Sequence, residues 1–369
     1  MASPALAAPA PRLVSRDPDA FPPVSGREED WRFTPLARLR GLHDGTAVVD
    51  GVLPVTVTAP EGVVVETIGA DHPLVGSVLV PADRAAALAM RDAKEGQLVR
   101  VTGELADPVV LRFEGAGQTS YGHVVVDVAP FARVTVVLEH TGSATHAGGV
   151  EVRVGDGADV TVVTVQDWAR DAVHLSAQAA SVGRDARYRH VAVSLGGDLV
   201  RLNPTVTYAG PGGSAELLGL AFAGACQHLE QRLLVEHTAP HCRSRVTYKT
   251  AAQGTEAHTV WIGDVVIRKD AVGTDTYELN RNLLLTDEAR ADSVPNLEIE
   301  TGEITGAGHA SATGRFDEQQ LFYLQARGIA PDEARRMVVR GFFAEVLQQV
   351  DLPDLEERLL ARIDEELAR

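Results

Sequence analysis

Short apolar runs separated by polar turns dominate the middle of the chain. Between about residues 120 and 305, runs such as ARVTVVLEH and TVWIGDVVI are rich in β-branched residues, which predicts strands. A turn, a small residue and an apolar strand recur at Ala132, Ala158, Ala186 and Ala215, with gaps of 26, 28 and 29 residues. A near-constant period is typical of a solenoid. Because the repeats consist of short Val/Thr/Leu strands without helical periodicity, we predict a right-handed parallel β-helix, a mainly β fold.

The segments on either side of this repeat differ from it in composition. Residues 1–26 are rich in Ala and Pro and are expected to form a flexible tail. Residues 27–118 contain REEDWRFTPL, several Val-rich runs and a helical pattern in PADRAAALAMRDAKEG, which together predict a short N-terminal helical and α/β region. The parallel β-helix core is therefore placed at residues 119–312.

Residues 313–369 have the pattern of a small helical module. Pro331 suits the first position of a helix, and acidic residues follow it in the first turn. The apolar face of this helix is predicted to contain Met337, Val338, Phe342, Val346 and Val350. Pro353 ends that helix and precedes a second, acidic helix. Its apolar stripe is expected at Leu355, Leu359, Ile363 and Leu367.

Charge and cysteine content limit the partners and the compartment. The 51 acidic and 34 basic residues give a net charge of -17, which repels phosphate backbones and anionic lipid headgroups. We therefore expect neither nucleic acid nor a membrane surface as a partner. The two cysteines, Cys226 and Cys242, do not form a disulfide framework in a chain of 369 residues, and a reducing cytoplasm is expected.

The usual catalytic motifs are absent from the sequence. It contains no GxSxG, no HExxH and no GxxxxGK[ST] phosphate loop. The densest set of possible metal ligands is Cys226, His228, His237, His241 and Cys242. Because their spacing matches no zinc motif, we interpret them as core and turn residues of successive coils rather than as ligands.

His309 is a single imidazole near the end of the β repeat. It follows Glu298, Glu300 and Glu303, and its neighbours in GAGHASATG are small enough to leave it accessible. A neutral imidazole can bind a transition metal or replace a thiolate on an iron–sulfur cluster. One ligand does not make a site. His309 is therefore either an exposed or capping histidine, or part of a site that another chain completes.

Five stretches resemble the SufB/SufD family of iron–sulfur cluster assembly proteins. They are REEDWRFTPL (27–36), VEHTAPHCRSRVTYK (235–249), TDTYELNRNLLLTDEARADSVPNLEIE (274–300), GHASATGRFDEQQLFYLQARGI (308–329) and DEARRMVVRGFFAEVL (332–347). Together they span nearly the whole chain beyond the N-terminal tail. Within the family, the chain most resembles SufD, the shorter paralogue.

The resemblance implies a non-enzymatic scaffold subunit. Such a subunit pairs with a SufB-like paralogue through its β-helix, and His309 would supply one ligand to iron or to a transient cluster shared with that partner. Many relatives have a Cys-x-His at this point, whereas Gly306, Ala307 and Gly308 precede His309 here, without a thiol. Some complexes of the family bind reduced flavin, but no motif in this sequence tests that.

The resemblance also implies that the C-terminal helices bind SufC, an ABC-type ATPase. This division of labour agrees with the missing phosphate loop. Aromatic and Arg side chains are common anchors at interfaces, although packing within the chain's own module explains them equally well. The candidate contacts are Phe322, Tyr323, Leu324, Arg327, Met337, Phe342 and Phe343.

Two alternative functions remain. A β-helix enzyme acting on polysaccharides would present polar side chains along a groove, but the aromatic content of 5% is low for sugar stacking. A SufB-like scaffold would hold a cluster by itself, for which two cysteines are few. The isolated chain could also form a homodimer.

Overall fold

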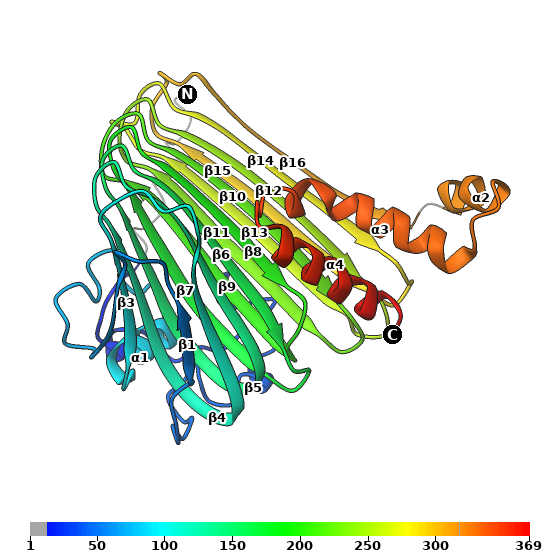
Figure 1. Ribbon diagram of the computed structural model, residues 1–369, viewed down its shortest axis with the longest axis horizontal. Coiled ribbons are helices and arrows are strands. Elements are labelled where there is room, and N and C mark those ends of the chain that lie inside the picture. The colour runs from blue at the N-terminus through cyan, green and yellow to red at the C-terminus, as the bar shows by residue number, and fades with distance from the viewer. Residues whose placement is uncertain (1–12, 317) are drawn as a thin grey trace, which may run out of the picture.

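The computed structural model describes residues 13–316 and 318–369 and contains a parallel β-solenoid with helices on its outer faces (Figure 1). The predicted parallel β-helix is confirmed. Two strands, β1 (Val55–Thr58) and β2 (Val64–Ile68), pair antiparallel with β4 and β3 near the start. The remaining strands are β3 (Gly96–Val101), β4 (Val109–Val128), β5 (Arg133–Val154), β6 (Asp159–Trp168), β7 (Val173–Val182), β8 (Arg187–Ser194), β9 (Leu199–Tyr208), β10 (Ser214–Ala223), β11 (His228–His237), β12 (Arg243–Ala252), β13 (His258–Ile267), β14 (Asp275–Leu284), β15 (Arg290–Ile299) and β16 (Gly306–Arg315).

The strands follow one another in a wound sheet with the order β15-β13-β11-β9-β7-β5-β6-β8-β10-β12-β14-β16. Odd-numbered strands from β7 form one wall, even-numbered strands from β6 form the other, and the long β5 pairs with the first strand of each. All pairings from β5 onward are parallel. Since side chains alternate along a strand, every second residue faces the interior of the solenoid.

The recurring alanines mark successive coils of the even-numbered wall. Ala132, Ala158 and Ala186 precede β5, β6 and β8 and are at most 2% exposed. The amide of Asp159 donates to the carbonyl of Ala132, and the amide of Arg187 donates to that of Ala158, at 2.9 and 2.8 Å. Each alanine is therefore a buried residue at a contact between successive coils. The period read from the sequence corresponds to one coil.

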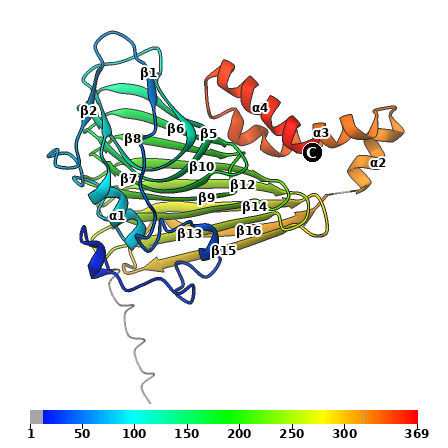
Figure 2. The same ribbon diagram turned by 90° about the horizontal axis from the view of Figure 1, so that it is seen from below.

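The N-terminal region packs on the odd-numbered wall (Figure 2). It contains two short 3-10 helices, η1 (Pro18–Ala20) and η2 (Leu36–Arg38), and the helix α1 (Arg84–Asp92), which confirms the helical pattern seen at this place. The side chain of Asp83 caps α1 by accepting a hydrogen bond from the amide of Ala86 at 2.8 Å. Trp31 and Leu88 belong to the apolar cluster that joins this region to the wall.

Three helices follow the solenoid, namely α2 (Glu318–Ala326), α3 (Pro331–Leu347) and α4 (Pro353–Leu367). The predicted helix start at Pro331 is confirmed, whereas Pro353, which was expected to end this helix, begins α4 after α3 has ended at Leu347. Buried apolar residues of α3 and α4 pack on the outer face of the even-numbered wall, where the rings of Phe343 and Phe222 are 6.4 Å apart. In both views α2 lies away from the solenoid (Figures 1 and 2).

The buried face of α3 differs from the predicted one. Val346 is buried as expected, but Val339 and Phe343 are also buried, whereas Met337 is 46% exposed and Phe342 is only half-buried. The assignment of Met337 to the apolar face was therefore wrong. The sequence contains two overlapping apolar stripes at helical spacing, and contact with the solenoid wall selects the one that contains Val339.

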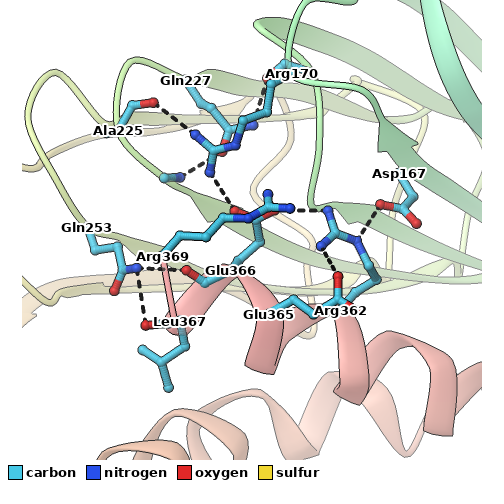
Figure 3. A network of polar contacts seen from close by, with 12 residues as sticks. Asp167, Arg170, Ala225, Gln227, Gln253, Arg362, Glu365, Glu366, Leu367 and Arg369 are labelled. Carbon is cyan, nitrogen blue, oxygen red and sulfur yellow. Dashed lines mark hydrogen bonds and ion pairs between the residues drawn. The ribbon is translucent and has the colours of Figure 1, made fainter.

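A buried carboxylate fixes the end of α4 to the solenoid (Figure 3). Glu366 has no exposed surface, and its oxygens accept hydrogen bonds from Arg170 at 2.6 Å, from Arg362 at 2.9 Å and from Arg369. The backbone carbonyl of Glu366 also accepts from the side chain of Gln253 at 2.7 Å. Because Arg170 and Gln253 lie in the connections that follow β6 and β12, these contacts join the C-terminal module to the solenoid.

Candidate functional site

The solenoid ends at β15 and β16, which form its last coil. In the described part of the chain, β15 pairs only with β13 and β16 pairs only with β14. The outer edges of both strands therefore present unpaired N–H and C=O groups. An exposed strand edge is a template for pairing with another chain unless something covers it. This open end is the feature of the fold most suited to receive a partner.

His309 lies on β16 at this open end. It is in register with Glu278 of β14, and both occupy positions that face the interior of the solenoid. Because no further coil follows, the side chain of His309 is exposed, whereas Glu278 is 1% exposed. We find no hydrogen bond or ion pair of His309 within the described residues. Its imidazole is thus accessible to a ligand or a second chain.

The interior next to His309 is polar. Asn280 and Asn282 on β14 bind Ser293 on β15 through hydrogen bonds of 2.7 Å each. Asn282 also donates to Thr313 on β16 at 2.9 Å, and Ser311 donates to Asn280 at 3.2 Å. These contacts join the last coil to the preceding one. The end of the core is therefore held by hydrogen bonds in place of the stacked valines found further back.

Glu278 is a buried acid without a partner. Neither carboxyl oxygen forms a hydrogen bond within the described chain. Burial, together with the negative charge of Asp264, raises the pKa of Glu278 to about 8. At neutral pH the carboxyl group is therefore mostly protonated. Nearby, the hydroxyl of Tyr248 and the indole nitrogen of Trp261 are also buried without partners.

The raised pKa of Glu278 predicts that the stability of the wild type, compared with that of the variant Glu278→Gln, depends on pH. The unfolded pKa is 4.5, so the folded wild type binds more protons than the unfolded chain between pH 4.5 and about 8 and becomes less stable as the pH rises through this window. As the pH rises, the free energy of unfolding of the wild type should fall relative to that of Glu278→Gln by up to about 1.4 kcal/mol per pH unit. Urea unfolding of both proteins at pH 5, 6.5 and 8 measures this difference, and a constant difference would contradict the assignment.

The dense set of cysteines and histidines is spread along the solenoid. Cys226 is exposed, Cys242 is buried, and His237 binds Ser244 at 2.9 Å in the interior. His228 lies 3.1 Å from the ring of His258. Among the residues that the structure describes, no three His, Cys, Asp or Glu side chains converge to hold a metal ion. The geometry favours the interpretation of this set as core and turn residues.

The candidate contacts for an ATPase fall into two groups. Phe322 and Tyr323 on α2 are 73% and 57% exposed, Arg327 stacks over the ring of Tyr323 at 4.7 Å, and Leu324 is half-buried. On α3, Met337 is exposed. The half-buried ring of Phe342 lies 5.5 Å from the ammonium group of Lys249, and Phe343 is completely buried. Only the first group and Met337 therefore offer substantial surface to a partner.

A cluster of buried histidines occupies the interior at the other end of the solenoid. The ring of His174 is 4.9 Å from that of His140 and 5.1 Å from that of His146. Burial lowers the pKa of His140 to about 3 and that of His146 to about 4, and it also lowers the pKa of His174. No sequence motif indicated this cluster, because His140 and His146 are six positions apart on the long β5 and His174 joins them only through the pairing of β7 with β5.

Comparison with known proteins identifies the family. The model of the SufBD core domain of the SUF system for FeS cluster assembly matches residues 111–342. The chain is 53% identical over 365 residues to an iron-sulfur cluster assembly SufBD family protein of Mycobacterium tuberculosis (strain ATCC 25618 / H37Rv), covering 96% of this chain and 92% of that protein. A protein of the same description from Mycobacterium leprae (strain TN) is 51% identical over 365 residues, with 96% and 93% covered.

A second SufBD family protein of the same M. tuberculosis strain is 30% identical over 207 residues, which are 56% of this chain and 24% of that protein. The fold defines a parallel β-solenoid whose last coil, formed by β15 and β16, pairs on one side only within the described chain. The chain belongs to the SufBD family of iron–sulfur cluster assembly proteins. This membership favours an assembly role over the polysaccharide-acting enzyme. No helix among the described residues is long and apolar enough to cross a membrane.

Proposed function

We propose that this protein is a SufD-like, non-catalytic scaffold subunit of a cytoplasmic Suf machinery. It pairs through its open end with a SufB-like paralogue and binds a SufC-like ATPase through its C-terminal helices. Iron, or a nascent iron–sulfur cluster, is the cargo, and His309 supplies one imidazole ligand from this chain. The observation that carries the proposal is the exposed imidazole of His309, which has no hydrogen-bond or ion-pair partner among the described residues, on the last coil of a SufBD family solenoid.

The surroundings of His309 support a shared site. The described residues contain no group of three convergent ligands, so this chain would need donors from a partner. The open edges of β15 and β16 are where a partner chain could add strands. The genome that encodes the 53% identical relative also encodes a second SufBD family protein, which provides a precedent for a paralogous pair.

Co-expression with a SufB-like paralogue and a SufC-like ATPase tests the proposal. We expect affinity purification of this chain to recover both proteins. A chain that purifies only as a monomer or homodimer under these conditions would contradict the proposed assembly. A stable cluster on the isolated chain after reconstitution with iron and sulfide would favour the SufB-like alternative.

The variant His309→Ala separates assembly from cargo handling. Because His309 is exposed and its imidazole forms no hydrogen bond or ion pair in the described chain, the variant should fold and join the complex as the wild type does. Loss of a ligand should lower the iron–sulfur content of the co-purified complex by at least about tenfold. Iron and sulfide analysis with visible absorption measures this content. Ser311→Ala on the same strand is the control, and equal losses in both variants would remove His309 from the mechanism.

The exposed side chains of α2 lead to a second, independent prediction about binding of the ATPase. Replacing both Phe322 and Tyr323 by alanine should weaken ATPase binding by about 2–4 kcal/mol, because exposed aromatic side chains often dominate an interface. The stability of the chain should not change. Phe131→Ala removes another aromatic side chain, 76% exposed on a solenoid turn, and is the control. Calorimetric titration with the ATPase that shows equal affinities for both variants would place the binding surface elsewhere.

A further inference from the structure

Glu278 is exceptional among the buried acids in the part of the chain that the structure describes. The other acidic residues that are less than 9% exposed all have cationic or hydrogen-bonding partners: Asp127 with Arg153, Glu139 with Arg112, Glu151 with His123, Glu230 with Arg201 and Glu366 with Arg170. Glu278 is equally buried, yet both of its oxygens lack a partner in the described chain. A buried carboxyl group without hydrogen bonds is destabilising. Its presence therefore needs an explanation other than the stability of the fold.

The location of Glu278 suggests an explanation for its burial without a partner. Its Cα is paired in register with that of His309 on the adjacent parallel strand. Neighbouring strands lie about 5 Å apart, and side chains paired in register project from the same face of a sheet. Glu278 therefore lies one coil further into the solenoid than the exposed imidazole of His309. No other coil separates the two residues.

The space around the carboxyl group is kept open by a glycine. Gly263 on the opposite wall faces Glu278, and a Cβ atom at this glycine would lie 2.8 Å from Oε1 of Glu278 and 2.5 Å from the ring of Trp261. Any larger residue at this position would therefore displace one of these side chains. On the adjacent strand β15, the residue paired with Gly263 is Pro295, which has no N–H group to donate to the carboxylate.

The donor atoms define a class of ligand. A carboxylate oxygen and an imidazole nitrogen together suit a divalent first-row transition metal such as Fe²⁺. The described residues hold no third convergent His, Cys, Asp or Glu, so two donors leave most of the coordination sphere to water or to a partner chain. A site of this kind is weak alone and becomes stronger when another subunit covers the open end.

We propose that Glu278 and His309 form the two-donor half of an iron site at the open end of the solenoid, with Glu278 as the inner oxygen ligand. The inference deepens the proposed function and rests on it for the identity of the metal. A bound cation would supply the positive charge that arginine side chains supply to Asp127, Glu139, Glu230 and Glu366. The ion enters from the open end, which His309 lines, and the paralogous subunit supplies the remaining donors.

Anaerobic titration of the isolated full-length chain with Co²⁺, an optical substitute for Fe²⁺, tests the site without any partner. The wild type should show saturable d–d absorption. His309→Ala and Glu278→Gln should each lower the Co²⁺ affinity at least tenfold. Glu303→Gln, which neutralises an exposed acid near the same end, should bind as the wild type does. Thermal unfolding verifies that all the variants are folded.

Two results would overturn the proposal. If Glu278→Gln binds Co²⁺ as tightly as the wild type while His309→Ala does not, Glu278 is a buried acid that does not bind the metal. If the wild type shows no saturable binding, the two residues do not form a site in this chain. Neither result depends on the co-purification experiment, so failure of the half-site and failure of the proposed function can be distinguished.

Discussion

Glu366→Ala should lower the free energy of unfolding by about 2–4 kcal/mol and release α4 from the solenoid. Glu366 is completely buried and accepts hydrogen bonds from Arg170, Arg362 and Arg369. Removing it leaves three guanidinium groups near one another without their shared anion. The expected loss is below that for a fully buried pair, because these arginine side chains are 20–49% exposed and water partly compensates them.

The neighbouring Glu365 provides a matched control. It also forms an ion pair with Arg362, at 2.7 Å, but its side chain is 60% exposed. Glu365→Ala should therefore change stability by less than about 1 kcal/mol. Urea unfolding measures both variants, and hydrogen exchange locates the effect. Exchange should accelerate in α4 in Glu366→Ala while the strands of the solenoid remain protected. Equal destabilisation by the two variants would contradict the importance assigned to the buried carboxylate.

Acid should destabilise the solenoid well before its carboxylates are protonated. Burial lowers the pKa of the following histidines: His140, His146, His174, His190 and His237. Their unfolded value is 6.5, so below that pH the unfolded chain binds more protons and the folded state is disfavoured. Their contribution to stability is complete above pH 6.5. It is lost towards pH 4, by up to about 1.4 kcal/mol per histidine per pH unit.

The melting temperature should therefore fall steeply between pH 6.5 and 5. Replacing His146 by glutamine should make this fall less steep, since one fewer proton is bound on unfolding. His309→Ala, which removes an exposed histidine outside this buried set, is the control. A melting temperature that stays constant between pH 7 and 5 would show that the buried rings are already protonated or that they become hydrated without unfolding.

The architecture could be predicted because it depends on repeated local chemistry. β-branched strands, polar turns and the alanines at Ala132, Ala158 and Ala186 recur once per coil, and each alanine lies where successive coils touch. Pro331 starts a helix as predicted, because its fixed φ and missing N–H suit a first turn, and Pro353 starts the next helix for the same reason. These signals are contained in a few neighbouring residues and do not require knowledge of distant contacts.

The site could be predicted only in part, because its other members are set by strand register. His309 stood out as a single imidazole in a stretch of small residues. Glu278 did not, since the strand TYELNR reads as ordinary alternation and only the pairing with β16 places this acid beside His309. Glu366 likewise appeared to be one of many surface acids on a charged helix. Its burial follows from Arg170, which lies almost two hundred positions earlier in the chain.

Hydrogen exchange of the amides in β15 and β16, with and without the SufB-like paralogue, tests the central claim most directly. If the open end of the solenoid receives that subunit, Arg290–Ile299 and Gly306–Arg315 should become strongly protected in the complex. The turns at the N-terminal end of the solenoid should exchange as they do in the isolated chain. Protection elsewhere, with β15 and β16 still exchanging freely in a purified complex, would contradict the account.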